Sequence, residues 1–245
     1  MLRRAPSLTD QVKTHLKDMI VNGEFPGGRI PPETELAEAL GVSRTTVRDA
    51  LSRLEMEGSI SRRQGAGTFV NKPVLQIRSR LEEIWSYEAM LQAHGFTPST
   101  RVIDAIAAPV SALPYDDAAA DLGISPHDSV LYIRKLFLED DVPVILAINV
   151  VPRPQELGGY TADDLGRPIY DFLDDLAQRR LSYYVTDVVP VLANGETAAL
   201  LRVAAGTPLV SFDETGYDDA NQPIVKAYSY FRDDLLRLRL LRRRV

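Results

Sequence analysis

The stretch GVSRTTVRDALSRLEMEG, Gly41 to Gly58, decides how the N-terminal part of this chain folds. Ser43 is a favourable N-cap residue and Gly58 is placed to end a helix. Four apolar residues recur at helical spacing and are expected to face a core: Val47, Ala50, Leu51 and Leu54. Arginines and threonines occupy the exposed side of the helix start, although the chain has a formal net charge of −6. Because the field near a helix end is local, global acidity does not oppose an anionic partner there.

Two more helices are expected before this stretch. The first covers SLTDQVKTHLKDMIVNG, with Ser7 as its cap, Gly23 at its end and an apolar face of Leu8, Val12, Leu16, Met19 and Ile20. The second runs from about Glu33 to Leu40 after Pro32, a residue tolerated in a first helical turn, and is expected to bury Leu36, Ala39 and Leu40.

A hairpin is expected after the quoted stretch. SISRR and TFV have the composition of short strands, and QGAG between them is a glycine-rich tip. The order helix, helix, turn, helix, hairpin predicts a winged helix-turn-helix. The third helix would then present its first turn to DNA, where free backbone N–H groups favour phosphate and arginine can bond guanine O6 and N7. The glycines of the tip would approach a minor groove, with Arg62 and Arg63 holding phosphates. Alternatively, Arg44 and Arg48 form a solvated helix face that pairs with Asp49 or Glu55.

The segment PPETELAEALGVSRTTVRDALSRLEMEGSISRRQGAGTFV resembles the DNA-binding domain of the GntR family of bacterial transcription regulators. That family carries the patterns PSE-x-x-LA, GVSR-x-TVR, L-x-x-x-G and G-x-GT-FV, and this chain departs from them by having Pro32 where Ser is common. With Arg62 from the reasoning above, the resemblance gives these candidate DNA-binding residues: Arg44, Thr45, Thr46, Arg48, Arg62, Gln64, Gly65 and Gly67.

The rest of the chain has a different pattern and charge. Residues 1–72 hold 11 Lys and Arg against 9 Asp and Glu, whereas residues 73–245 hold 17 against 25. We therefore expect two domains, 1–72 and 73–245. After the polar connection NKPVLQIRSR, the sequence predicts a helix over LEEIWSYEAMLQAHG, then six strand-like segments interspersed with short helices. The strand-like segments are TRVIDAIAA, SVLYIRKLFLE, VPVILAINVVP, SYYVTDVVPVL, PLVSFDETGYD and PIVKAYSYFR. The expected fold class is α+β, with a mostly antiparallel sheet.

This layout resembles the UTRA ligand-sensing domain of the HutC branch of the GntR family, whose fold is shared with chorismate lyase. Five segments carry the resemblance, in the family's order: ADLGISP, KLFLEDDVP, IYDFL, AALLRVAAGTP and YSYFRDD. The family often writes the hairpin among them as R-x-R-x-x-D-x-x-P, and here neither arginine is present. The resemblance implies a domain that binds small effectors, and we expect it to dimerise because a single DNA-binding head makes few base contacts.

In relatives that sense phosphosugars, the two hairpin arginines, a Ser before a tyrosine, a Thr on the first helix and a late Glu hold the ligand. The matching positions here are Lys135 and Phe137, Pro168, Glu88 and Val225. Lysine does not replace a bidentate arginine, and Glu88 would repel phosphate. We therefore expect an effector less anionic and more apolar than a sugar phosphate. The candidate effector-binding residues are Glu88, Lys135, Phe137, Tyr170, Val225 and Arg232. Alternatively, Phe137 and Val225 are sheet core and Glu88 is a solvated charge.

Several function classes find no support in the sequence. The chain has no cysteine, which excludes disulfides and thiolate chemistry and fits a reducing cytoplasm. There is no apolar run of membrane-spanning length, and because no apolar region follows the arginines of MLRRAPSLTD, no signal peptide is expected. His15, His94 and His127 lack the spacing of metal ligands, so neither a metal site nor a cofactor is expected. The tail LLRLRLLRRRV is expected to be an edge strand with a frayed cationic end.

These features together predict a cytoplasmic, dimeric transcription regulator, and we expect a repressor rather than an enzyme. Its partners would be a palindromic double-stranded operator, bound in successive major grooves, and a small-molecule effector. Two alternatives remain open at this point. One is an enzyme with a lyase-like C-terminal domain, and the other is a DNA-binding protein that responds to no ligand.

Overall fold

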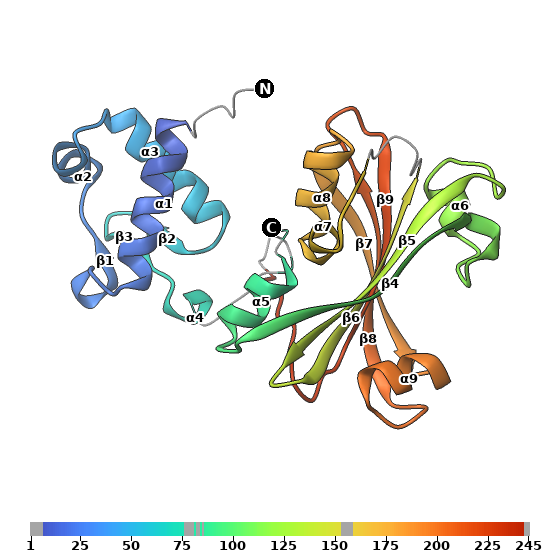
Figure 1. Ribbon diagram of the computed structural model, residues 1–245. Coiled ribbons are helices and arrows are strands. Elements are labelled where there is room, and N and C mark those ends of the chain that lie inside the picture. Colours follow the sequence, from blue (N-terminus) through green and yellow to red (C-terminus); the bar gives the residue numbers. More distant parts are fainter. Residues whose placement is uncertain (1–6, 76–80, 82–83, 85, 153–158, 243–245) are drawn as a thin grey trace. The chain divides into compact units, whose positions relative to one another are not determined.

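The computed structural model describes residues 7–75, 81, 84, 86–152 and 159–242 (Figure 1). The chain divides into two compact units, Met1–Arg80 with Arg239–Val245, and Leu81–Leu238. The predicted domain boundary after residue 72 stays a prediction. No helix among the described residues is both long enough and apolar enough to cross a bilayer.

The first unit contains the expected helices and a small antiparallel sheet of strand order β1-β3-β2. Its elements are α1 Leu8–Val21, a 3-10 turn at Pro26–Gly28, β1 Arg29–Ile30, α2 Glu33–Leu40, α3 Arg44–Met56, β2 Ile60–Arg63, β3 Gly67–Val70 and α4 Lys72–Leu75. The winged helix-turn-helix order read from the sequence is thereby confirmed. The short helix α4 lies in the segment predicted to be a polar connection, of which residues 76–80 lie outside the described residues.

Local capping explains where the helices of this unit begin and end. The Asp10 N–H donates to Ser7 Oγ at 3.2 Å, and the Thr46 N–H donates to Ser43 Oγ at 3.1 Å. Gly41 ends α2 in the left-handed region, with φ +65°, which turns the chain directly into the cap of α3. A side chain at this backbone conformation would be strained, so glycine fixes the tight turn between the two helices.

The core of the first unit lies between α1, α2 and α3. Its members include Val12, Leu16, Ile20, Leu36, Val47, Ala50, Leu51 and Leu54. Two predicted core residues are exposed instead. Leu8, 52% exposed, lies in the first turn of α1, where no described element covers it. Ala39 is exposed and Ala37 is buried, because the inward face of α2 is centred between Leu36 and Ala37.

The second unit is built on a six-stranded antiparallel sheet of order β4-β5-β6-β9-β8-β7. Its strands are β4 Pro98–Pro109, β5 Ser129–Glu139, β6 Val142–Pro152, β7 Tyr183–Leu192, β8 Pro208–Tyr217 and β9 Pro223–Phe231. Its helices are α5 Tyr87–Ala93, α6 Ala118–Asp121, α7 Ala162–Gly166, α8 Ile169–Leu176 and α9 Gly195–Leu201, with a 3-10 turn at Val110–Ala112. All six strand-like segments are strands, which confirms the α+β fold class.

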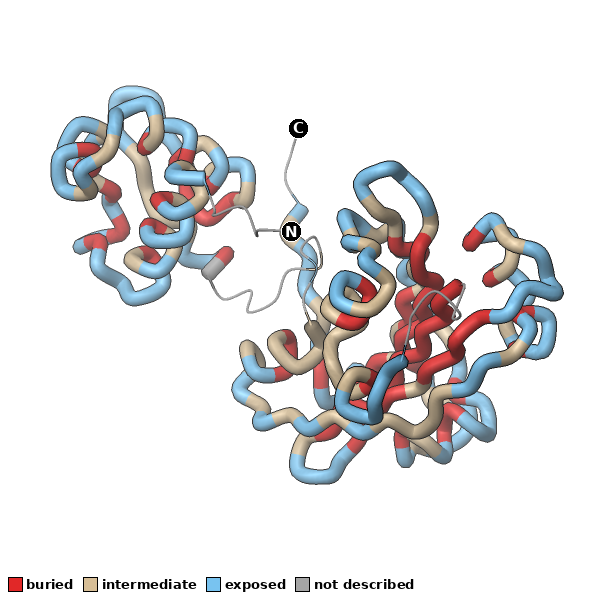
Figure 2. The backbone as a smooth tube through the Cα atoms, turned by 45° about the horizontal axis from the view of Figure 1, so that its top comes forward, coloured by how far each residue is buried: buried red, intermediate tan, exposed pale blue. Residues whose placement is uncertain are grey.

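Helices cover both faces of this sheet (Figure 1). On one face, α6 and α9 pack against the even-numbered residues of β5, such as Val130 and Tyr132. On the other face, α5, α7 and α8 pack against odd-numbered residues such as Leu131 and Phe137. Buried positions consequently follow the central strands (Figure 2). The continuous apolar runs of β5 and β6 have this cause, since both of their faces are covered.

Two expectations for the second unit are wrong in detail. The helix expected over residues 81–95 begins only at Tyr87, because Ser86 Oγ accepts from the Ala89 N–H at 3.0 Å and caps it there; residues 82, 83 and 85 of the expected helix lie outside the described residues. The described part of the tail, up to residue 242, forms no strand. Its residue Leu236 is buried against the core beside α5 instead. The short helix α7 was not predicted from the sequence.

Candidate functional site

The start of α3 presents an exposed polar surface. Arg44 and Thr45 are exposed, and Arg44 has no ion-pair partner among the described residues. Thr46 is half-buried, because its N–H and its hydroxyl both lie against Ser43 Oγ, at 3.1 and 2.8 Å. The Ser43 cap therefore fixes the first turn of α3, and the exposed guanidinium of Arg44 on that turn is available to a binding partner.

Glu33 at the start of α2 forms ion pairs with two further arginines of this surface, Arg48 and Arg62. Its carboxylate accepts from Arg48 Nε at 3.0 Å and lies 3.8 Å from the guanidinium of Arg62. The Glu33 carboxylate also raises the pKa of Arg48, chiefly through that hydrogen bond. The Arg48 side chain remains 54% exposed. The sequence suggested Asp49 or Glu55 as its partner, and the structure places Glu33 there instead.

Arg62 connects the hairpin to α3. Its backbone N–H donates to Glu55 Oε1 at 3.1 Å, and its guanidinium donates to the Arg48 carbonyl at 3.4 Å. The guanidinium also lies 3.6 Å from the Glu55 carboxylate. Charged contacts of this kind fix the orientation of β2 relative to the exposed side of α3.

The hairpin tip carries three predicted residues: Gln64, Gly65 and Gly67. Gly65 has φ +73° with open space around it, and Gly67 has φ +114°, so both hold conformations that favour glycine. A Cβ on Gly67 would lie 3.5 Å from Arg29 Nε. Arg29 is exposed on β1 and pairs in register with Phe69, and this long-range pairing brings a cation to the tip that sequence reasoning missed.

A cavity of about 510 Å³ lies in the second unit, on the face of the sheet that α5 and α8 cover. Its walls come from α5, β5 to β9 and the segment leading into α8. Four of the predicted effector residues line it: Glu88, Lys135, Phe137 and Tyr170. Pro168, the residue in the place of the family serine, lines it as well. The topology therefore brings together residues that lie up to 82 positions apart in the sequence, from Glu88 to Tyr170.

The structure does not bring Val225 and Arg232 to the cavity wall. Val225 is fully buried in the core against α7 and α8, nearer the start of β9 than the lining residues Ala227 and Ser229. Arg232 follows β9, where it donates to the Pro143 carbonyl at 3.2 Å and pairs with Asp234 at 2.7 Å. Its contacts hold the end of the strand.

Glu88 and Lys135 form the first polar group of the cavity. Glu88 Oε1 accepts from the Thr100 hydroxyl at 2.9 Å, while Glu88 Oε2 is buried without a hydrogen-bond partner among the described residues. Lys135 Nζ donates to the Arg167 carbonyl at 2.5 Å. Burial lowers the pKa of Lys135 to about 8, opposed by the charge of Glu88. One donor of the Lys135 ammonium is therefore bonded to a backbone carbonyl, whereas Glu88 Oε2 has no donor among the described residues.

Glu214 on β8 forms a second polar group that sequence reasoning missed. It accepts from the Thr186 hydroxyl at 2.7 Å, and burial raises its pKa. Nearby, the Tyr87 hydroxyl donates to Ser229 Oγ at 2.6 Å. A charged glutamate within the strand-like segment PLVSFDETGYD could have indicated a binding residue. The sequence does not show, however, which face of that strand borders a cavity.

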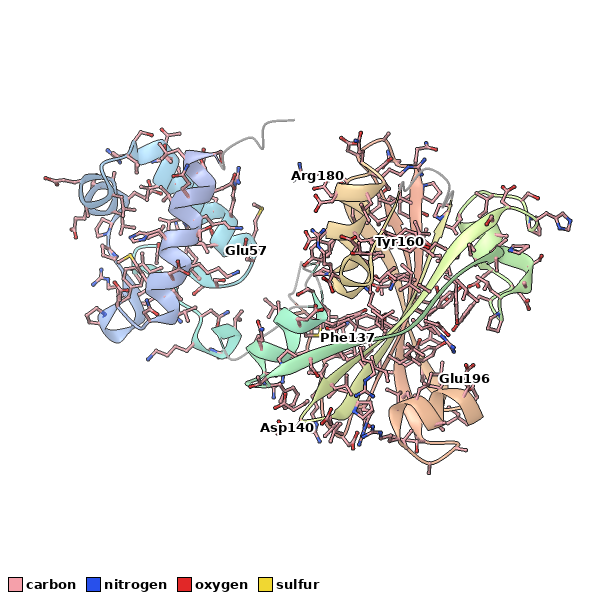
Figure 3. The ribbon with its side chains drawn as sticks, in the orientation of Figure 1. Glu57, Phe137, Asp140, Tyr160, Arg180 and Glu196 are labelled. Atoms are coloured by element: carbon pink, nitrogen blue, oxygen red, sulfur yellow. The ribbon has the colours of Figure 1, made fainter. Side chains whose placement is uncertain are left out.

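Aromatic rings form the apolar part of the wall. Tyr87 packs edge-on against Phe137, with ring centroids 5.2 Å apart, and Phe212 lies 4.6 Å from Phe231. Figure 3 places Phe137 beside α5 and Glu196 on α9, on opposite sides of the sheet. Phe137 is therefore both a core residue and a lining residue, so the two readings offered by the sequence are compatible.

Three carboxylates on the other side of the sheet lie within 4.8 Å of one another, close enough to share one metal ion: Asp117, Asp121 and Asp213. The buried ammonium of Lys226 pairs with all three of them, at 3.6 Å from Asp117 Oδ2 and closer to the other two. Asp117 also accepts from the Tyr228 hydroxyl at 2.5 Å. Because Lys226 already pairs with all three carboxylates, the cluster is an ion-pair network of the protein's own side chains, and we assign no metal ion to it.

Comparisons with known proteins match both units. The family described as bacterial regulatory proteins, gntR family, matches residues 8–70, and the UTRA domain matches residues 93–237, more than half of the chain. The matches therefore cover both the helix-turn-helix surface and most of the cavity wall.

Individual relatives agree with these matches. The HTH-type transcriptional repressor NagR of Bacillus subtilis is 32% identical over 226 residues, covering 91% of this chain and 90% of the relative. The histidine utilization repressor of Pseudomonas putida is 28% identical over 222 residues, covering 89% and 84%. Among solved structures, the possible transcriptional regulator YydK of Bacillus subtilis has a TM-score of 0.75 at 16% identity, covering 97% of this chain and all of that one, which supports the fold.

Proposed function

We propose how DNA binding and effector sensing are divided within this chain, which belongs to the gntR family of bacterial regulatory proteins and carries a UTRA domain. Members of this family are transcription regulators that bind operator DNA, and the UTRA domain binds small-molecule effectors. The chain is accordingly a DNA-binding transcription repressor controlled by an effector, and not an enzyme. Because operator DNA lies in the bacterial cytoplasm, we propose that the protein works there.

The proposed DNA contacts lie on the first turn of α3 and on the tip of the β2–β3 hairpin. They are Arg44, Thr45, Thr46, Arg48, Arg62, Gln64, Gly65 and Gly67. The observation that carries this assignment is the exposed guanidinium of Arg44 on a rigidly capped helix start. Arginine there can bond a guanine edge bidentately in the major groove. Arg48 and Arg62, already held by Glu33, are suited to phosphate contacts that set the register.

The experiment is a binding titration with Arg44→Ala on the duplex that the wild-type protein selects from a random pool. We expect affinity to fall about 10- to 100-fold, corresponding to the loss of about 1–3 kcal/mol, and base preference to relax at one position in each half-site. The matched control is Arg53→Ala, because Arg53 lies on the same helix but pairs with Asp10 of α1. Equal losses in both variants would reject the proposed reading surface.

The proposed effector site is the cavity beneath α5 and α8. Its charged and aromatic wall supports an effector less anionic and more apolar than a sugar phosphate, because no arginine is among its described lining residues. Binding of such a molecule changes DNA affinity only if it favours one arrangement of the DNA-binding units over another. Release of the selected duplex by a sugar phosphate at low concentration would contradict this part of the proposal.

We also propose a homodimer that assembles through the open edge of β7. Most residues of this strand are exposed, although Tyr184 and Val191 pack against the core, and it presents a set of large apolar side chains: Tyr183, Val185, Val188, Val189 and Leu192. Its outer backbone groups are free to pair with another strand. A second copy is the occupant that a two-fold operator requires, since a single helix-turn-helix makes few base contacts.

A further inference from the structure

The charges that face the cavity are unusual for a site that would bind an anion. Among its described lining residues three are ionisable at neutral pH, namely Glu88, Glu214 and Lys135. Two carboxylates therefore stand against one ammonium group, and the formal balance is negative. An anionic effector would have to enter against that balance, whereas a cation would correct it.

The lysine is poorly placed to reverse this balance. Its side chain is 2% exposed, and its Nζ already donates to the Arg167 carbonyl. A buried lysine held in this way offers one point charge and no bidentate fork for a phosphate or carboxylate. The contact described for its Nζ is to that backbone carbonyl, so Lys135 interacts with Glu88 through charge but forms no ion pair with either glutamate among the described contacts.

Glu88 has the opposite property, since one of its carboxylate oxygens is an acceptor that the described residues leave unused. Glu88 Oε2 is shielded from solvent and has no hydrogen-bond partner among the described residues. A buried carboxylate oxygen in that state costs free energy, which a donor brought by a ligand would recover. Glu214 is half-buried on β8 and lines the same cavity, and the donor described for it is the Thr186 hydroxyl rather than a cation.

The apolar part of the wall suits the remainder of such a ligand. Phe137 and Phe212 provide ring faces, and Met90 provides a flexible thioether. Aromatic rings attract a protonated nitrogen as well as an apolar body. The volume of about 510 Å³ is within the range of small-molecule sites.

We propose that the effector is an organic cation: a small amine or amidine whose protonated nitrogen is bound by Glu88 and Glu214 and whose apolar body packs on Phe137 and Phe212. This inference rests on the proposed function of the cavity as the effector site. It names the class of ligand, and it assigns Glu214 to recognition.

The test is a thermal-shift screen of the full-length protein with matched pairs of compounds that share a skeleton. Examples are tyramine against 3-(4-hydroxyphenyl)propanoate and glucosamine against glucose 6-phosphate. We expect the amine member of at least one pair to raise the melting temperature and its acidic partner to have no effect. Stabilisation by acids or phosphates alone would overturn the inference and leave the sensor proposal standing. The absence of any stabilisation across the pairs would overturn both.

Variants then locate the binding groups of the amine that stabilises the protein. Glu214→Gln and Glu88→Gln should each weaken its binding about tenfold or more in calorimetry, since each removes a charged acceptor. The control Asp219→Asn removes a charge from an exposed turn and should leave the affinity unchanged. If a glutamate variant fails to fold, the affinity of Lys135→Met still distinguishes a cationic ligand from an anionic one. Lys135→Met should preserve or strengthen amine binding, and a loss of binding in this variant would overturn the inference.

Discussion

At the scale of single residues, Lys135 shows how the cavity affects stability. It lies on β5, an interior strand of the sheet, with its side chain almost fully buried, and burial lowers its pKa to about 8. An unfolded chain binds this proton with a pKa near the ordinary value of 10.5. Between these two values the unfolded state holds more protons than the folded state, so the stability of the folded protein rises with pH.

A comparison of wild type with Lys135→Met isolates this effect. Relative to the variant, we expect the free energy of unfolding of the wild type to increase by about 2 kcal/mol between pH 7 and pH 10. Urea denaturation at several pH values measures it. The exposed Lys72→Met serves as the control and should show no such trend. A difference that stays constant with pH would mean that Lys135 is not desolvated in solution.

At the scale of elements, the capping of α3 determines whether the DNA-reading turn exists in one conformation. Ser43 Oγ forms two hydrogen bonds with Thr46, one to its N–H and one to its hydroxyl. These two bonds define the first turn, which carries Arg44 and Thr45. Pairing of β1 with β3 then adds Arg29 to the wing from a different part of the chain. Local contacts therefore order the start of α3, whereas the surface at the tip of the β2–β3 hairpin also depends on pairing with the distant strand β1.

Removal of the cap should have a measurable cost. We expect Ser43→Ala to reduce the stability of the isolated segment 1–80 by about 1 kcal/mol, because the Thr46 N–H loses its acceptor. Urea unfolding followed at 222 nm gives the value. Thr34→Ala, at an exposed position on α2, is the matched control and should change stability by less than about 0.5 kcal/mol. If both substitutions behave alike, the cap does not stabilise α3.

At the scale of the whole molecule, the two edges of the large sheet differ. The edge strand β4 is partly covered by α5 and α7, whereas β7 contacts mainly its neighbour β8. Exposed valines on β7 leave an apolar edge that a monomer would carry at the risk of aggregation. This difference is the reason for assigning the proposed dimer contact to β7.

Substitution of one residue on each edge tests the assignment. We expect Val188→Asp to weaken dimerisation at least about tenfold, because it places like charges beside each other and buries them in the interface. Ile106→Asp makes the same change on β4, at a similarly exposed side chain, and should leave the dimer intact. Sedimentation velocity over a concentration series distinguishes the two. A monomer produced only by Ile106→Asp would move the interface to the opposite edge.

The sequence by itself determined the elements whose causes are local. The helix around Arg44–Met56 follows from its cap and its apolar spacing, and the six strands follow from their composition and the turns between them. The same local reasoning failed at Tyr87, where a cap inside the expected helix starts it late, and at the tail, where burial of Leu236 replaces strand pairing.

Tertiary structure alone decided which side chains share a site. Glu88, Lys135 and Glu214 come from one helix and two strands, and only the strand order β4-β5-β6-β9-β8-β7 places them around one cavity. Val225 and Arg232, chosen by position in a family pattern, lie in the core and at a strand end instead. The physical reason is that capping and periodicity act over a few residues, whereas the walls of a cavity are formed by register between strands far apart in the chain.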